Sequence, residues 1–241
     1  MKRILALMLA VLLIVSLAAC GEKKEAQTST EAASEAEIIK SGGWTVNEYA
    51  SPVELPEEVQ TAFNLANANL DGVMYTPIAY LGSQVVAGTN YAVLCLAEPV
   101  VENPEITLKV EIIYADLEGN YEVTKISDFN IEDYTQGEGK TPETLSGGWS
   151  VPETVTVSAL SSDAEAAFKK ALEGFTGNSL TPMAQLGSQV VAGTNYAILC
   201  NSKLVTAEPV SSIQVVTVYA DLNGGAEISN ICTLDIADFN K

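Results

Sequence analysis

The chain of 241 residues contains no histidine, and this limits the chemistry that its other reactive side chains can perform. Catalysis by Ser-His-Asp or Cys-His groups needs an imidazole base, and many zinc sites need imidazole ligands. Aspartate and glutamate total 31, so chemistry by paired carboxylates stays possible. However, no acidic residue falls in segments 81–95 and 186–200, which repeat one another most closely. We therefore expect no catalytic residues, no metal and no cofactor, and predict that the chain is not an enzyme.

The closest repeat is the octapeptide Gln-Val-Val-Ala-Gly-Thr-Asn-Tyr, found at Gln84–Tyr91 and again, 105 positions later, at Gln189–Tyr196. The surrounding segments 81–95 and 186–200 agree at 14 of 15 positions. Such self-similarity indicates a tandem duplication. Because the two halves differ widely elsewhere, these segments carry a constraint that the rest of each half lacks.

The two halves also begin alike, because Ser-Gly-Gly-Trp occurs at Ser41–Trp44 and, with the same spacing, at Ser146–Trp149. The roughly 200 residues after the N-terminal region suffice for two domains of about 100 residues each. Segment 133–145 is rich in Thr, Gly, Pro and Glu, a composition typical of a linker. We therefore predict a first repeat at 41–132, a linker at 133–145 and a second repeat at 146–241.

The first 19 residues have the pattern of an export signal. Lys2 and Arg3 precede an almost unbroken apolar run of 14 residues, Ile4–Leu17, whereas a spanning helix needs about 20. The run ends in Leu-Ala-Ala-Cys, which resembles a bacterial lipobox. The resemblance implies that 1–19 is removed and that the thiol of Cys20 is lipidated. An ordinary secretory signal cleaved near the same place is the alternative.

Segment 20–40 is rich in Glu, Ala, Ser, Thr and Lys and has no aromatic residue. Such a composition cannot bury enough surface to fold, so we predict a flexible tether. Together with a lipid on Cys20, it predicts a lipid-anchored protein of the cell surface or cell envelope, outside the cytoplasm.

The chain is strongly acidic, with a formal net charge of −19. Such a surface repels nucleic acid and anionic lipid and favours a basic partner. We therefore expect no nucleic-acid partner, and we expect contact with the membrane through the lipid on Cys20.

Each half is predicted to begin with one amphipathic helix. In the first half Pro56, Glu57 and Glu58 suit a helix N-terminus. In the second half Ser162 and Glu165 form a predicted capping box. The apolar stripes that we expect to face the core are Val59, Ala62, Phe63, Ala66 and Leu70 in the first helix and Ala164, Ala167, Phe168, Ala171 and Phe175 in the second.

The rest of each half has the alternation and turn residues of antiparallel strands. The expected strands are 75–86, 89–96, 106–112 and 121–129 in the first half and 213–219 and 226–235 in the second. Asn223-Gly224 is a strong hairpin signal, because both turn positions must accept a positive φ. Asp-Phe-Asn stands at 128–130 and at 238–240, 110 positions apart. That spacing predicts an insertion of about five residues late in the second half.

These elements predict an α+β fold in which each half lays an antiparallel meander across one helix. In a meander, a third strand separates the strand of Cys200 from that of Cys232. Next-but-one strands lie about 10 Å apart, and bridging requires a Cα separation below about 7 Å. We therefore expect Cys200 and Cys232 to be unbridged.

Gln-Val-Val-Ala-Gly resembles the first-hairpin motif of the cystatins, inhibitors of papain-like cysteine proteases, and Thr-Asn-Tyr continues the match. Gly42-Gly43-Trp44 is similar to the glycine-containing N-terminal segment of that family. The helix comes first, and the turn at Leu117–Asn120 falls where the second inhibitory hairpin should lie. The resemblance covers each repeat nearly end to end. It implies two tandem cystatin-like domains, each an antiparallel β-meander wrapped across one α-helix.

The resemblance also implies a mechanism, in which the N-terminal segment and two hairpins fill a protease cleft as a wedge. The implied residues of the first wedge are Gly42, Gly43, Gln84, Val85, Val86, Ala87, Gly88 and Leu117. Those of the second wedge are Gly147, Gly148, Gln189, Val190, Val191, Ala192, Gly193 and Leu222. Small uncharged residues tolerate desolvation on contact, and a pre-shaped hairpin loses little entropy on binding. Because Glu118 makes the first tip acidic, we expect the second repeat to inhibit more tightly.

Two alternatives remain open from the sequence. The chain could be a cystatin-like module that binds another protein or a glycan without inhibiting a protease, and the octapeptide could be kept only for its turn geometry. Trp44 and Trp149 directly follow the glycines. We expect them to pack the first strand of each half against its helix, and contact with a protease is the alternative.

Overall fold

The computed structural model describes residues 43–48, 55–136, 147–153, 160–207 and 209–241. The predicted signal, the tether with Cys20, Gly42 and most of the predicted linker lie outside the described residues. In the part of the chain that is described, no helix is long and apolar enough to cross a membrane.

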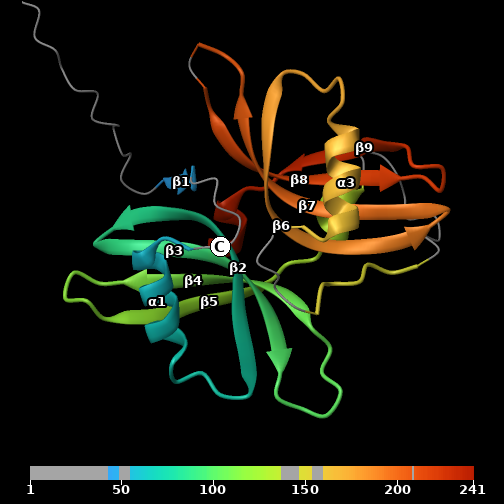
Figure 1. Ribbon diagram of the computed structural model, residues 1–241. Coiled ribbons are helices and arrows are strands. Elements are labelled where there is room, and N and C mark those ends of the chain that lie inside the picture. Colours follow the sequence, from blue (N-terminus) through green and yellow to red (C-terminus); the bar gives the residue numbers. More distant parts are fainter. Residues whose placement is uncertain (1–42, 49–54, 137–146, 154–159, 208) are drawn as a thin grey trace, which may run out of the picture. The chain divides into compact units, whose positions relative to one another are not determined.

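The first repeat combines one long helix with a five-stranded antiparallel sheet (Figure 1). Its elements are β1 (Trp44–Val46), α1 (Glu57–Asn67), β2 (Val73–Val86), β3 (Gly88–Pro99), β4 (Thr107–Ala115), β5 (Tyr121–Asp128) and the short α2 (Glu132–Thr135). The strand order is β1-β2-β3-β4-β5, so the predicted meander is confirmed.

The second repeat has the same order of elements. They are α3 (Ser162–Ala171), β6 (Asn178–Val191), β7 (Gly193–Leu204), β8 (Ser211–Ala220), β9 (Ala226–Thr233) and the 3-10 helix η1 (Ile236–Asn240). The sheet order is β6-β7-β8-β9, and an isolated bridge between Ser150 and Ser188 lies where β1 pairs in the first repeat. The protein is thus a mixed α/β protein with two antiparallel sheets and few helices, compatible with the predicted α+β class.

Each helix covers one face of its own sheet (Figure 1). Val59, Ala62 and Phe63 of α1 pack with Val93 and Ile113 of the sheet. Ala164, Ala167 and Phe168 of α3 make the equivalent core in the second repeat. The predicted stripes are confirmed except at their last residues. Leu70 lies beyond the end of α1 and is exposed, and Phe175 lies beyond the end of α3 but still packs against the core.

The N-terminus of α3 differs from the predicted capping box. The cap is Ser161, whose Oγ accepts a hydrogen bond from the backbone N–H of Ala164 at 3.3 Å. Ser162 is instead the first helical residue, so the prediction was wrong by one position. Two adjacent serines offer the same side-chain chemistry, and sequence spacing alone did not distinguish them.

The opposite faces of the two sheets share a single core, which the sequence analysis did not foresee. Its buried members from the first sheet include Leu81, Ala92, Leu94, Leu108, Val110 and Ile112, and those from the second include Leu186, Ala197, Leu199, Ile213 and Val215. Ile38–Lys241 accordingly form one compact unit. Both faces of the central strands are therefore buried, which explains the unbroken apolar run Ala92–Ala97.

Trp44 and Trp149 are partly buried against this shared core. The expectation that they pack against the helices was therefore wrong. The first segment of each repeat lies at the edge of its sheet, and its tryptophan points to the face that the two sheets share.

Two short segments, which we call straps, cross from one repeat to the other. The first strap is residues 129–135, which include α2, and α2 contacts β8 and β9. The second strap is residues 234–240, which include η1, and η1 contacts β4 and β5. Asn230 Nδ2 donates to the carbonyl oxygen of Tyr134 at 2.9 Å, and Ser127 Oγ donates to that of Phe239 at 3.3 Å.

Each strap places an isoleucine on a glycine of the other repeat. A Cβ atom at Gly187 would lie 2.8 Å from Cδ1 of Ile131, and one at Gly82 would lie 2.9 Å from Cδ1 of Ile236. A Cβ at Gly82 would also press on the carbonyl oxygen of Thr45, and one at Gly187 would lie 3.0 Å from that of Ser150, so glycine lets both the edge segment and the isoleucine approach the strand. These two glycines belong to the closely repeated segments, and their identity thus has a packing reason.

The straps also correct the predicted insertion in the second repeat. The backbone N–H of Phe129 donates to Leu108, and that of Leu234 donates equivalently to Ile213. Phe129 therefore corresponds to Leu234, and Ile131 to Ile236, at the same spacing of 105 found elsewhere. The repeated Asp-Phe-Asn was a misleading match, and no insertion is needed. The first residues of the predicted linker, Asp133–Thr135, belong to α2.

The three described cysteines are free thiols. Cys200 lies on β7 and Cys232 on β9, and β8 separates these strands, as the meander predicts. Burial raises the pKa of the Cys95 and Cys200 thiols, so both stay protonated and unreactive at neutral pH.

One buried carboxylate distinguishes the two helix–sheet cores. Glu111 of β4 is fully buried, and its Oε2 accepts a hydrogen bond from Asn67 Nδ2 at 2.9 Å. Within the described residues its Oε1 has no partner. Burial raises the pKa of the Glu111 carboxyl, and the bond from Asn67 lowers it in part. The second repeat has Val216 and Leu172 at the equivalent positions.

Glu111→Gln is expected to change how stability depends on pH. Because the folded-state pKa is raised, the carboxyl stabilises the fold fully below its unfolded pKa of about 4.3. That contribution is lost as pH rises through the folded-state pKa. Urea unfolding from acid to neutral pH should therefore show the variant gaining stability over the parent as pH rises. N67L/E111V, which copies the second repeat, should also gain stability over the parent as pH rises. A difference in unfolding free energy that does not vary with pH would contradict a raised pKa of Glu111.

Candidate functional site

The predicted wedge elements of the first repeat meet at one end of its sheet. Trp44 pairs with Gln84, so the start of β1 lies beside the end of β2. Thr89 pairs with Ala115, so the turn after β4 lies beside the β2–β3 tip. We call the resulting group, which consists of Gly43, residues 84–88 and Leu117, the first tip.

The second repeat brings together its own predicted residues in the same way. Thr194 pairs with Ala220, which places the turn bearing Leu222 beside the β6–β7 hairpin. Gln189 Nε2 donates to the carbonyl oxygen of Gly147 at 2.9 Å, which holds the N-terminal glycine segment against this hairpin. The second tip is therefore Gly147, Gly148, residues 189–193 and Leu222.

Large apolar side chains are exposed at both tips. Val85 is 41% and Leu117 is 86% exposed at the first tip, and Val190 is 72% and Leu222 is 83% exposed at the second. Solvent contact of this kind costs free energy that a partner surface could recover, at about 25 cal/mol per Å² of apolar area buried. The chemistry available here is apolar contact.

A tyrosine that the sequence analysis did not single out fixes each hairpin tip. Tyr114 Oη donates to the carbonyl oxygen of Ala87 at 2.5 Å, and Tyr219 Oη donates to that of Ala192 at 2.6 Å. The signal was available, because Tyr-Ala-Asp-Leu occurs at 114–117 and again, 105 positions later, at 219–222.

The second turn of each tip is held by an aspartate. Asp116 Oδ1 accepts hydrogen bonds from the backbone N–H groups of Glu118 and Asn120, both at 2.8 Å. Hydrogen bonds from the Asn120 side chain and backbone lower the pKa of Asp116. Asp221 accepts equivalently from Asn223 and Gly225, which also lowers its pKa. The two turns are therefore shaped before any partner arrives.

Most positions of the octapeptide have a role inside the protein. Asn90 Nδ2 donates to Gln84 Oε1 at 2.8 Å, and Asn195 repeats this bond to Gln189 at 2.9 Å. Tyr91 packs against the helix core. The identity of these residues thus needs no external partner.

Gly88 has its own structural reason. Its φ is +133°, and a Cβ there would press on the carbonyl oxygen of Ala115 and lie 2.8 Å from Cε2 of Tyr114. Gly193 repeats this arrangement with φ +135°. What these contacts leave unexplained is the identity of the exposed valines, Val85 and Val86 in the first repeat and Val190 in the second, whereas Val191 is half-buried.

In the described ranges, no group of three or more His, Cys, Asp and Glu side chains is arranged to hold a metal ion. A scan against protein-family models and a search of curated proteins both found no match for the chain.

Comparing Gly88→Ala with Gly119→Ala separates the cost of steric crowding at a glycine from the cost of its positive φ. Both glycines have positive φ, but nothing lies within 4 Å of a Cβ built at Gly119. Gly119→Ala should therefore cost only the conformational term of about 1 kcal/mol. Gly88→Ala also crowds Tyr114, so its cost in folding free energy should be larger by about 1–3 kcal/mol. Urea unfolding measures both, and equal losses would contradict the tight hairpin geometry.

Proposed function

We propose that the chain is a surface-anchored, reversible inhibitor of papain-like cysteine proteases, built from two tandem cystatin-like domains. The proposal rests on the resemblance of the octapeptide and on one observation. At each tip the glycine segment, the first hairpin and the second turn lie together, and the tip exposes valine and leucine side chains to solvent.

A wedge that inhibits by occupying a cleft must be rigid and apolar at its end. The Tyr114 bond to Ala87 and the Asp116 turn supply rigidity at the first tip. Tyr219 and Asp221 do so at the second. Val85, Val86 and Leu117 supply the apolar area. No group of the tip needs to react with the protease, so inhibition is reversible.

We further propose that a lipid on Cys20 and the tether 20–40 hold this inhibitor at the outer face of a membrane. The acidic net charge of −19 keeps the folded part from anionic lipid and from nucleic acid. The alternative function is a cystatin-like module that binds another protein or a glycan. It uses the same exposed tips but does not block a protease.

Titration of active papain of known active-site concentration with the mature chain, residues 20–241, tests the proposal. Isolated repeats are unsuitable, because the two sheets share one core. Gly88→Glu and Gly193→Glu are also unsuitable, because any side chain there disrupts the hairpin. The informative variants are Val85→Glu and Val190→Glu, which place a charge on an exposed tip residue of one repeat at a time.

We expect the parent to inhibit papain and each variant to lose one inhibitory site, because burying an unpaired charge in the cleft is costly. The site that survives in Val85→Glu should be tighter, since the second turn lacks the carboxylate of Glu118. Val100→Glu and Val205→Glu are matched controls, because both valines are 73% exposed at the other end of the sheets. Absence of inhibition by the parent, or equal losses in the controls, would overturn the proposal.

A further inference from the structure

The end of the first sheet opposite to the first tip carries an open cavity. Along the β2–β3 ladder Val86 pairs with Gly88 at the tip, whereas Val73 pairs with Pro99 at this other end. The cavity has a volume of about 560 Å³ and is lined by Met74, Glu98 and Pro99 on the strands and by 100–102 and Pro104 in the loop that follows.

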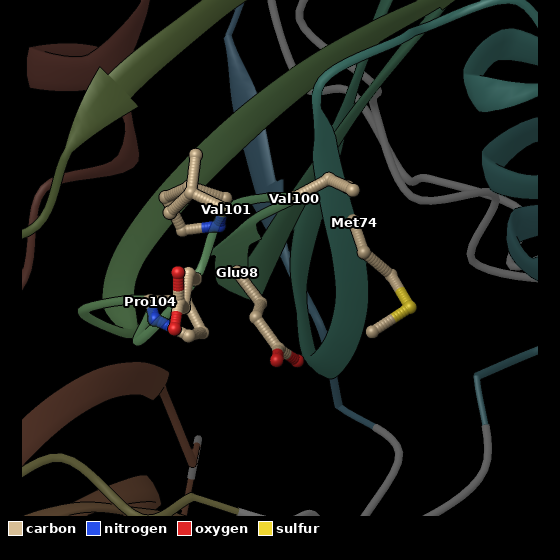
Figure 2. Close-up of a pocket in the computed structure, with 7 residues that line it drawn as sticks. Met74, Glu98, Val100, Val101 and Pro104 are labelled. Carbon is tan, nitrogen blue, oxygen red and sulfur yellow. The ribbon is translucent and has the colours of Figure 1, made fainter.

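The walls of this cavity are apolar. Figure 2 shows Met74 and Glu98 side by side on neighbouring strands, with Val100 and Val101 above them. Met74, Val100 and Val101 are all exposed large apolar residues. A partner that covered them would gain the free energy of removing apolar surface from water.

Two carboxylates stand among these apolar walls. Glu98 is partly buried and Glu102 is exposed. Within the described part of the chain, neither makes an ion pair or a side-chain hydrogen bond. Both carboxylates are therefore available to a cationic group of a partner.

The cavity is shaped in advance by its backbone. The N–H of Val100 donates to the carbonyl oxygen of Gly72, and the N–H of Val101 donates to that of Pro99, each at 2.9 Å. Asn103 has φ +59°, which turns the chain back between Pro99 and Pro104. A ligand would therefore not have to order the loop on binding.

The second repeat provides an internal comparison at the same spacing of 105. Lys203 stands at the position of Glu98, Ala207 at that of Glu102 and Ser179 at that of Met74. Glu208 falls at the position of Asn103 and lies outside the described residues. The combination of two unpaired carboxylates with Met74 is therefore specific to the first repeat.

We propose that this cavity binds a peptide segment of a partner protein in which apolar side chains stand next to lysine or arginine. Apolar side chains of the peptide pack on Met74, Val100 and Val101, and its cations pair with Glu98 and Glu102. The first tip lies some 13 ladder positions away, or about 40 Å at roughly 3.3 Å per residue. The site is therefore independent of the proposed protease contact, and both can be occupied at once.

Fluorescence anisotropy of the full mature chain with a short fluorescein-labelled peptide of alternating leucine and lysine tests this proposal. We expect saturable binding of one peptide per chain. The variant E98Q/E102Q should weaken it by roughly tenfold or more. M74S/V101T, which copies the second repeat, should also weaken it. E122Q/E227Q removes the same charge from exposed positions on β5 and β9 and should leave the affinity unchanged.

Replacing leucine by serine or lysine by glutamate in the peptide should each abolish binding. Equal losses in E98Q/E102Q and E122Q/E227Q would show attraction to net charge alone and overturn the proposal, as would binding that does not saturate. Inhibition of papain by E98Q/E102Q should match the parent, so failure here is distinct from failure of the proposed inhibitor.

Discussion

The burial of both faces of each sheet is the constraint on which the rest of this structure depends. One face packs under a helix of the same repeat, and the other faces the core that the two repeats share. At Gly82 and Gly187, an isoleucine from the strap of the other repeat packs against the strand and extends this core. Neither sheet could expose its shared face without leaving residues such as Leu94 and Leu199 in water.

This constraint changes how the repeated segment is understood. Much of its sequence identity serves the fold: Gly82 accepts Ile236, Gln84 accepts a hydrogen bond from Asn90, and Gly88 passes close to Tyr114. What remains exposed to solvent is Val85 and Val86 at the first tip and Val190 at the second, each presented by a hairpin that Tyr114 or Tyr219 fixes. Duplication thus displays the same apolar tip twice on one body. The cavity beside Glu98 has no such duplicate, because the loops after β3 and β7 have diverged in charge.

Local patterns predicted the helices and the meander order, and the family resemblance implied the grouping of the tip residues. Helical spacing placed Phe63 and Phe168 correctly, and turn residues placed the hairpins. Features set by long-range packing were missed. The alternation from Ile106 to Ile112 identified one apolar face but gave no sign that Glu111 on the other face is buried as well. The repeated Asp-Phe-Asn hid the equivalence of Ile131 and Ile236, which the matching backbone hydrogen bonds of Phe129 and Leu234 reveal. Trp44 was expected to pack against the helix, because the core that the two sheets share could not be predicted from local patterns.

The central claim, that the two repeats share one core and fold as one unit, is tested most directly by native-state hydrogen exchange in Ile131→Ala. Ile131 belongs to the first repeat and packs on Gly187 of the second. Its truncation should cost about 2–5 kcal/mol. We predict that the slowest amides of β3 and β7 lose protection together and by the same free energy, since both exchange through global unfolding. Loss of protection confined to one sheet would contradict the account.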